Sequence, residues 1–365
     1  MRADRIFSAA DAERLAKRRL PWMVYDYFSG TAGDGTSAAR ARAGFDQITL
    51  MPRILRDVSD RSLASSVFGQ KTGTPFGIAP MGMCNLAAPG ADLMLARLAA
   101  RKQVPHVLST VASTPLEQII ETAEGNAWFQ LYFSGDGQQG FKLADRAKSA
   151  GFTTLVLTVD VPEVGRRLGE LRHGFKYPFR MGPRQFFDFM CHPRWSIPGL
   201  LAGKPQMANF DMPGYEFDRA ASRAKATFDT LKKLRDAWPG NLVVKGVMDT
   251  DDAQQLKTLG VDAIQISNHG ARQLASSPAP VSRIAPIRDT IGRDMPLFFD
   301  SGIRSGEDMI KTLHSGADFV FVGRILLFAI AAAGEEGLHR MWDVLEAELS
   351  TTMAQIGATN LTSFR

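Results

Sequence analysis

The sequence contains little cysteine: only Cys84 and Cys191 occur among its 365 residues. Two cysteines cannot build a disulfide framework, and neither lies in a Cys-X-X-Cys or Cys/His cluster that would hold a metal. The chain also lacks an uninterrupted run of about 18 apolar residues, the length that crosses a bilayer. Its N-terminal residues, MRADRIFSAADAERLAKRRLPW, lack the apolar core of a secretory signal. We therefore expect a cytoplasmic protein without a metal centre.

Nucleic-acid-binding motifs are absent as well, although the net charge is +5. The basic excess is local, because residues 165–205 contain eight Lys or Arg against two acids, Glu170 and Asp188. A nucleic-acid-binding protein more often shows a basic stripe tied to a recognisable motif, so we expect no such partner. The composition, 45% hydrophobic and 22% charged, is that of an ordinary globular protein. The length suits one elaborated domain over residues 1–365.

Eight short apolar runs recur along the chain, and each ends in polar residues or glycine. Continuous apolar runs of this length are typical of parallel strands that are buried on both faces. The expected strands are FGIAP (76–80), HVLST (106–110), WFQLY (128–132), TLVLTVD (154–160), LVVKG (242–246), AIQISN (263–268), PLFFDSG (296–302) and DFVFVGR (318–324).

Helix-like patterns alternate with these strands, which predicts an α/β fold of the (β/α)8 TIM-barrel type. A doubly wound sheet usually has fewer strands, and the other alternative is that some runs are buried helices. Further helices at 8–28 and 338–356 are expected to cap the barrel. The expected barrel helices are 90–102, 115–123, 138–150, 223–237, 250–259 and 305–315, with Thr114, Thr250 and Ser305 as N-caps.

The connection from the fourth strand to the fifth, residues 161–218, is far too long for an ordinary barrel loop. Within it, residues 165–205 mix their basic side chains with seven aromatic ones and with IPGLL (197–201). This mixture suits a segment that lies on an anionic membrane surface. A lid over the active face, or an oligomer contact with a solvated basic face, is the alternative. On the membrane hypothesis, deleting about residues 178–212 is expected to solubilise the protein and to leave the chemistry of the active face intact.

In such a barrel the chemistry lies at the carboxyl ends of the strands. DSGIR (300–304) and VGR (322–324) follow the last two strands, where these barrels usually bind phosphate. Glycines let backbone N–H groups approach phosphate oxygens, and Arg304 and Arg324 can pair with the dianion. Other polar residues at strand ends are Gln130, Tyr132, Thr158, Asp160, Lys245, Ser267, His269 and Asp300.

Lys245 ends the fifth strand and needs an anionic partner there. A flavin that gains negative charge on reduction is one candidate, and a Schiff-base role for the lysine is the rival. SNHGARQL (267–274) favours the flavin, because His269 is placed to abstract a proton and Arg272 to grip a carboxylate with two hydrogen bonds.

At these residues the chain resembles the FMN-dependent family that oxidises 2-hydroxy acids, which includes L-lactate dehydrogenase, mandelate dehydrogenase and glycolate oxidase. The resemblance covers nearly the whole chain and rests on many motifs in one order. They are LPWMVYDYFSG (20–30), IAPMG, LST, WFQLY, LTVD, GRR, VVKG, SNHGARQL, DSGIR and VGR.

The resemblance implies a role for each motif residue. His269 is the base that removes a proton from the 2-hydroxy acid, and Asp160 stabilises its imidazolium form. Arg272 and Tyr27 bind the substrate carboxylate, Tyr132 the substrate hydroxyl, and Arg167 matches a mobile active-site arginine, with Tyr25 a weaker alternative to Tyr27. Lys245 stabilises reduced FMN. The other FMN-binding residues would be Pro80, Met81, Gly82, Ser109, Gln130, Thr158, Ser267, Asp300, Gly302, Arg304, Gly323 and Arg324.

Three departures from the family pattern bear on specificity. Gly82 resembles the dehydrogenases, since members that react readily with oxygen often have Ala there, although lactate monooxygenase, another member of the family, also has glycine. Val111 replaces a bulky aromatic residue of glycolate oxidase and, with Met81 and Met83, indicates an apolar pocket or simply ordinary packing. Ala275 stands where many relatives have Asp, and this difference has no explanation here.

These features predict oxidation of a lactate- or mandelate-like L-2-hydroxy acid to the 2-keto acid. The dehydrogenase branch implies a quinone or another non-oxygen acceptor, peripheral attachment to the cytoplasmic face of the membrane, and a homotetramer. The alternatives are an oxygen-using oxidase or monooxygenase of the same fold, another FMN barrel, and a non-catalytic barrel that binds an anion or a lipid.

Overall fold

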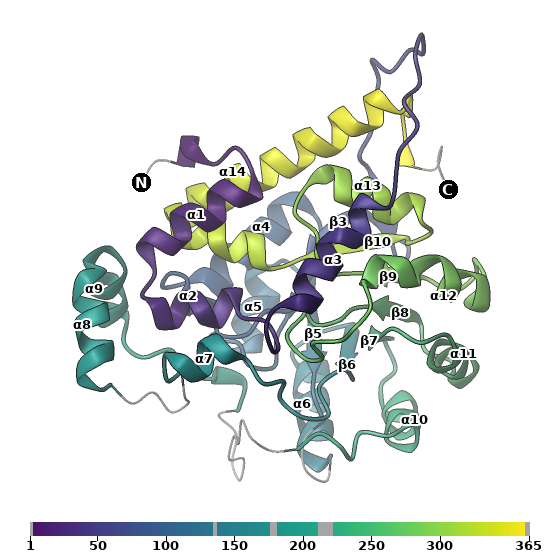
Figure 1. Ribbon diagram of the computed structural model, residues 1–365. Helices are drawn as coiled ribbons and strands as arrows, with labels where there is room; N and C mark the ends of the chain where they lie inside the picture. The colour runs from purple at the N-terminus through teal and green to yellow at the C-terminus, as the bar shows by residue number, and fades with distance from the viewer. Residues whose placement is uncertain (1–2, 134–136, 176–180, 211–221, 362–365) are drawn as a thin grey trace.

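A computed structural model of the protein describes residues 3–133, 137–175, 181–210 and 222–361. Eight parallel strands close into a barrel in sequence order, and β10 pairs with β3 to complete it (Figure 1). The predicted (β/α)8 fold is therefore confirmed, with a strand at each of the eight predicted runs. The strands are β3 (Phe76–Ile78), β4 (His106–Leu108), β5 (Ala127–Leu131), β6 (Thr154–Thr158), β7 (Asn241–Val247), β8 (Ala263–Ile266), β9 (Leu297–Phe299) and β10 (Phe319–Val322).

The barrel interior is filled by side chains, so it is a packed core and not a pore. Trp128, Phe298 and Phe321 lie within about 6 Å of one another between ring centroids. Phe68, in the turn of an antiparallel hairpin formed by β1 (Ser65–Val67) and β2 (Gln70–Thr72), packs against Trp128 and Phe298. This packing explains the apolar character of the strand side chains that face into the barrel, and those that face outward belong to a second buried apolar cluster.

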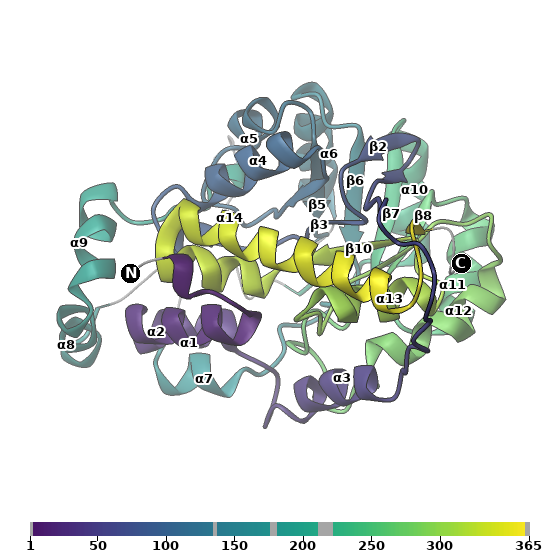
Figure 2. The same cartoon turned by 90° about the horizontal axis from the view of Figure 1, so that it is seen from above.

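Helices surround the barrel and pack against the outside of its strands (Figure 2). Two predicted N-caps are wrong. The N-cap of the helix predicted at 115–123 is Pro115 and not Thr114, because the backbone is still extended at Pro115. The N-cap of the helix predicted at 250–259 is Asp249 and not Thr250, because the Asp249 carboxylate accepts hydrogen bonds from the first turn. The predicted cap Ser305 is confirmed. The barrel helices are η2 (Cys84–Leu86), α4 (Ala91–Lys102), α5 (Leu116–Thr122), α6 (Gln138–Ser149), α10 (Phe228–Ala237), α11 (Thr250–Leu259), η4 (Pro280–Arg283), α12 (Ile284–Ile291), α13 (Gly306–His314) and α14 (Arg324–Gln355), which is broken at Ala333 and Gly334.

The predicted N-terminal helix is divided in two. α1 (Ala9–Arg19) packs along α14, and α2 (Trp22–Ser29) starts afresh because Pro21 cannot continue the first helix. The second helix brings Tyr27 to the barrel mouth, whereas Tyr25 bonds Glu13 on the other side. Two further N-terminal helices are η1 (Ala3–Arg5) and α3 (Thr36–Asp46).

The long connection between β6 and β7 contains α7 (Leu168–Arg172), α8 (Pro183–Cys191), α9 (Pro193–Ala202) and η3 (Ala208–Phe210). The first of these lies close to α2, while α8 and α9 extend from one side of the molecule (Figures 1 and 2). Two buried polar residues anchor the connection: Asp188 accepts from the backbone of Trp22, and Asn209 accepts from Leu116. Among the described residues, no helix is both long and apolar enough to cross a membrane.

Candidate active site

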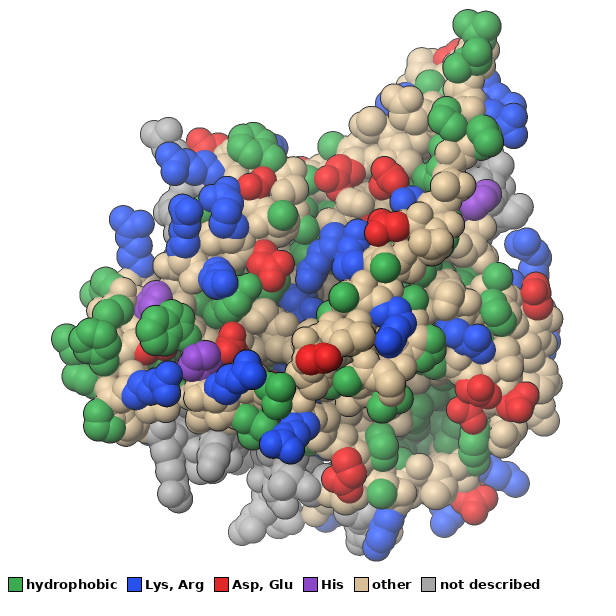
Figure 3. All heavy atoms as spheres, viewed as in Figure 1, with side chains coloured by type: hydrophobic (Ala, Val, Ile, Leu, Met, Phe, Trp, Pro, Cys, Tyr) green, Lys and Arg blue, Asp and Glu red, His purple; other side chains and the backbone are tan. Residues whose placement is uncertain are grey.

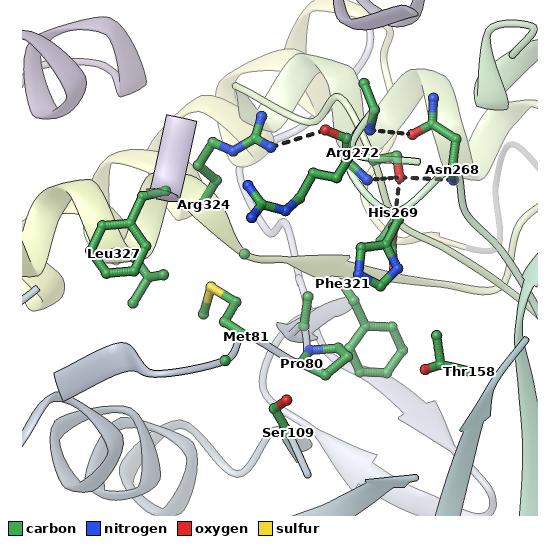
Figure 4. A pocket seen from close by; sticks show the side chains of 18 of the residues that line it. Pro80, Met81, Ser109, Thr158, Asn268, His269, Arg272, Phe321, Arg324 and Leu327 are labelled. Atoms are coloured by element: carbon green, nitrogen blue, oxygen red, sulfur yellow. Dashed lines mark hydrogen bonds between the residues drawn. The ribbon is translucent and has the colours of Figure 1, made fainter. Parts of the chain in front are cut away.

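A cavity of about 290 Å³ opens at the carboxyl ends of the strands (Figure 4). Most of the predicted site residues line it. Three do not, and each instead bonds a residue that does: Asp160 binds His269, Gln130 binds Ser109, and Ser267 binds Lys245. The lining residues from the prediction are Tyr27, Pro80, Met81, Gly82, Ser109, Tyr132, Thr158, Arg167, Lys245, His269, Arg272, Asp300, Gly302, Arg304, Gly323 and Arg324.

His269 follows β8 in a turn whose backbone has φ of +59°, a conformation that costs roughly 1–3 kcal/mol for a residue with a side chain. Its backbone N–H donates to Ser267 Oγ, and that of Gly270 donates to Ser301 Oγ. In Figure 4 the imidazole extends from this turn into the cavity, on the side of Pro80. The strained turn therefore holds the ring in the site.

The imidazole is oriented by a carboxylate. His269 Nδ1 lies 2.9 Å from Asp160 Oδ1, and Nε2 lies 3.5 Å from Tyr132 Oη. Burial is the largest single influence and raises the pKa of Asp160, but the contacts with His269 and the charge of Lys245 together lower it more, so that carboxyl stays ionised and can only accept. The proton of a neutral ring is thus on Nδ1, and Nε2 is left as the basic atom. Burial lowers the pKa of His269, and Asp160 opposes this change without reversing it. The lowered pKa keeps the ring neutral at pH 7.

Lys245 forms a buried ion pair at the base of the cavity. Its Nζ lies 3.0 Å from Asp300 Oδ2 and donates to Ser267 Oγ at 2.7 Å. Burial lowers the pKa of Lys245, but Asp300 and Asp160 together raise that pKa by more, so the net change is upward. A Schiff-base lysine needs a lowered pKa, so this geometry argues for a fixed positive charge and against the nucleophilic role.

Glu170, which the sequence reasoning missed, joins the two arginines predicted to bind substrate. Its Oε1 accepts from Arg272 Nη2 at 3.0 Å and from Arg167 Nη1 at 3.2 Å. Arg272 Nη1 also donates to the carbonyls of Tyr27 and Gly30. Two guanidinium groups thus meet at one carboxylate, which holds both of them at the cavity. The i, i+3 spacing of Glu170 from Arg167 in a basic segment was the available signal.

Two further arginines lie together at the other end of the cavity. Arg324 Nη2 donates to the carbonyl of Gly270 at 2.9 Å (Figure 4). Burial, with the nearby charges of Arg304 and Arg272, lowers the pKa of Arg324 to about 9. Gly302 has φ of +84° in the turn after β9. Two close cations beside glycine-containing turns make a site that an anion such as phosphate would stabilise.

The middle of the cavity also carries polar atoms that need a partner. Within the described part of the structure, Gln130 Nε2 and Thr158 Oγ1 are buried without a hydrogen bond. Buried polar atoms are nearly always bonded in folded proteins, so both atoms indicate a polar ligand above the barrel core. A ring with donors and acceptors at its edges, joined to a phosphate, fits this arrangement, and FMN is such a group.

A (β/α)8 barrel with a phosphate end, a place for a polar ring and a histidine–carboxylate pair defines the class of flavin-binding barrel enzymes. The sequence model of the family described as FMN-dependent dehydrogenase matches residues 16–365, and the chain belongs to that family. It is an oxidoreductase that uses FMN, as the sequence predicted.

Named relatives extend over nearly the full length. A putative L-lactate dehydrogenase of Mycobacterium tuberculosis is 39% identical over 96% of this chain and 86% of its own. The (S)-mandelate dehydrogenase of Pseudomonas putida is 37% identical over 98% of this chain and 92% of its own. A crystal structure described as the monotopic membrane protein (S)-mandelate dehydrogenase has a TM-score of 0.93 at 36% identity, covering 98% of this chain and 97% of that one.

Proposed function

We propose that the protein oxidises a small L-2-hydroxy acid, lactate- or mandelate-like, to the 2-keto acid and passes the electrons to a quinone or another non-oxygen acceptor. The observation that carries this proposal is the pair of His269 and Asp160, whose basic atom Nε2 faces the cavity beside Tyr132. Two relatives whose names include lactate and mandelate support the substrate class. When bound, FMN supplies the acceptor for the two electrons that the acid loses.

The polar side chains around His269 are assigned different roles in binding and proton transfer. Nε2 removes the proton of the hydroxy acid, and Asp160 stabilises the imidazolium that results. Burial and the charge of Asp160 raise the pKa of Tyr132 to about 12, so its hydroxyl stays protonated and can donate to the substrate oxygen. Arg272 binds the carboxylate with help from Tyr27 and Arg167.

The FMN-binding residues form a second group. Lys245 provides a fixed positive charge for the reduced ring, whose other contacts would be Pro80, Met81, Ser109, Gln130, Thr158 and Ser267. Arg304 and Arg324 would hold the phosphate, and Asp300, Gly302 and Gly323 would belong to the ribityl-phosphate end of the site.

The test is an anaerobic absorbance spectrum of the purified protein. L-lactate or L-mandelate is expected to bleach the yellow flavin, and the D enantiomers are expected to have no effect. A yellow protein that no small 2-hydroxy acid bleaches would overturn the proposal. Dye reduction without oxygen, compared with oxygen consumption, then separates a dehydrogenase from an oxidase or monooxygenase.

Gly82 offers a prediction about the face on which substrate and flavin meet. A Cβ atom here would lie 2.4 Å from Val111 Cγ2 and 3.2 Å from Tyr27 Oη. Gly82→Ala must therefore displace Val111, Tyr27 or both, and we expect flavin reduction about 10- to 100-fold slower because small misplacements of binding groups cost that much. The double variant Gly82→Ala/Val111→Ala removes the shorter contact, with Val111, and keeps only the longer one with Tyr27 Oη. Anaerobic stopped-flow reduction should recover largely in it; failure to recover would show that the clash with Val111 is not the cause.

Exposed apolar side chains on α8 and α9 support a membrane partner. Leu200 and Leu201 are each 84% exposed, and Phe186 and Phe187 are exposed on the neighbouring helix. Figure 3 shows hydrophobic side chains beside Lys and Arg over these two helices, at the left of the molecule. Apolar groups rimmed by basic ones suit an anionic membrane surface, and a relative's structure is described as monotopic. We therefore propose that this face binds the membrane.

The deletion of residues 178–212 is a poor test, because it removes Asn209, which donates to the backbone of the β4 loop, and part of it lies outside the described residues. The triple variant Phe187→Glu/Leu200→Glu/Leu201→Glu leaves these anchors in place. We expect it to lose sedimentation with vesicles that contain anionic lipid. The control, Ile54→Glu/Leu55→Glu, changes exposed apolar residues on another segment and should sediment normally. Equal binding by wild type and triple variant would contradict the proposal.

A further inference from the structure

Arg223 has no role in the chemistry described above, yet it lines the cavity. Its backbone N–H donates to the carbonyl of Pro162 at 2.9 Å, which fixes the residue beside the segment that follows β6. Its guanidinium carbon lies 4.9 Å from the centroid of the Tyr132 ring, and Tyr132 is the residue that contacts the base His269. A positive charge therefore lies next to the substrate half of the site.

Two nitrogen atoms of the Arg223 guanidinium are buried without a hydrogen-bond partner among the described residues. These atoms, Nε and Nη1, are shielded from solvent. Buried donors of a charged group are costly when unpaired. The two atoms thus indicate a polar ligand at this place, as the unpaired atoms of Gln130 and Thr158 do for the flavin.

The other cations near the substrate half each have a carboxylate partner. Lys245 pairs with Asp300, and Arg272 and Arg167 both contact Glu170. The carboxylate of a 2-hydroxy acid would balance that pair of arginines. No ion pair with a carboxylate is found for Arg223 in the described ranges, so its charge calls for a second anion.

The cavity also has apolar lining residues. Val111, Val161, Val164 and Met207 line it, as Arg223 does. A short aliphatic chain suits such a lining, and a charged group at its far end would meet the guanidinium. An anion held at a short distance from the reacting carbon is the group that this arrangement selects.

We infer that Arg223 binds a second carboxylate at the distal end of the substrate, and that the preferred substrates are L-2-hydroxy dicarboxylic acids. The inference rests on the proposed function, because it assumes that Arg272 takes the first carboxylate and His269 the proton. It narrows the expected substrates from 2-hydroxy acids with an apolar side chain to those whose side chain ends in a second carboxylate.

The test compares acids of matched length that differ only in the terminal group: L-malate with L-2-hydroxybutanoate, and L-2-hydroxyglutarate with L-2-hydroxypentanoate. The measured quantity is the ratio of kcat/KM values for anaerobic dye reduction within each pair. We expect the wild type to prefer the diacid of one pair about 10-fold or more, as a charge-assisted hydrogen bond provides. Arg223→Met, of similar length but uncharged, is expected to abolish or reverse this ratio.

Two variants keep the test specific. Lys225→Met removes an exposed cation two residues away and should leave the ratio as in the wild type, while Arg223→Lys should retain part of the preference. Yellow colour and the far-ultraviolet circular dichroism of each variant check that it is folded and loaded. A wild-type ratio near one in both pairs, or an equal loss for the diacid and its monoacid in Arg223→Met, would overturn the assignment of Arg223 and leave the proposed function standing. Bleaching by none of the four acids, nor by lactate or mandelate, is instead the failure of the proposed function.

Discussion

Replacing His269 with Gln is expected to slow anaerobic flavin reduction by the hydroxy acid about 10²–10⁴-fold, the range that a positioned base contributes. The amide cannot take the proton that Nε2 accepts, although it fills much of the same space. The protein should stay yellow, because His269 is not among the groups proposed to hold FMN. Stopped-flow absorbance gives the rate, and His314→Gln on the exposed end of α13 is the matched control. Reduction at the normal rate would remove His269 from the base role.

The same assignment predicts the pH dependence of kcat/KM. The base works only when neutral, so activity should fall as pH decreases through the pKa of His269. Burial lowers that pKa below the ordinary value of 6.5, with Asp160 opposing the change. The acid limb of the profile is therefore expected below pH 6.5. An acid limb above pH 7 would show that a different group titrates.

The barrel was predictable from the sequence because its strands are buried on both faces. Runs such as TLVLT can pack only in a core, and eight of them in alternation with helices leave few architectures. Chain order alone also placed His269, Lys245 and Asp300 at one end of the barrel, since parallel strands expose their carboxyl ends together. Periodicity thus fixed both the fold and the location of the chemistry.

Other parts of the site depend on contacts that periodicity does not report. Glu170 and Arg223 come from the connection between β6 and β7, whose packing has no repeating pattern. Asp160, Gln130 and Ser267 were expected at strand ends, and the resemblance gave them roles, but only the structure shows that they lie behind the lining residues and bond to them. Oligomeric state depends on surfaces of a second chain, so the homotetramer stays a prediction, which sedimentation velocity would test.

The buried ion pair between Lys245 and Asp300 gives a large expected effect on stability. Both side chains are less than 9% exposed, and Asp300 also accepts from Gln265 and Ser267. Lys245→Met leaves the carboxylate of Asp300 without its cation in the barrel core. Breaking a buried pair by removing one partner costs about 3–5 kcal/mol, and we expect that loss in the free energy of unfolding of the FMN-free protein. Urea unfolding followed by circular dichroism measures it.

A double variant distinguishes the effect of breaking the ion pair from the effect of losing the lysine side chain. Lys245→Met/Asp300→Asn removes both charges, so it should recover much of the lost stability, because the penalty comes from the uncompensated carboxylate. Lys257→Met is the matched control: its partner Asp294 is exposed, and water screens the remaining charge. A double variant no more stable than Lys245→Met would mean that the lysine acts through packing.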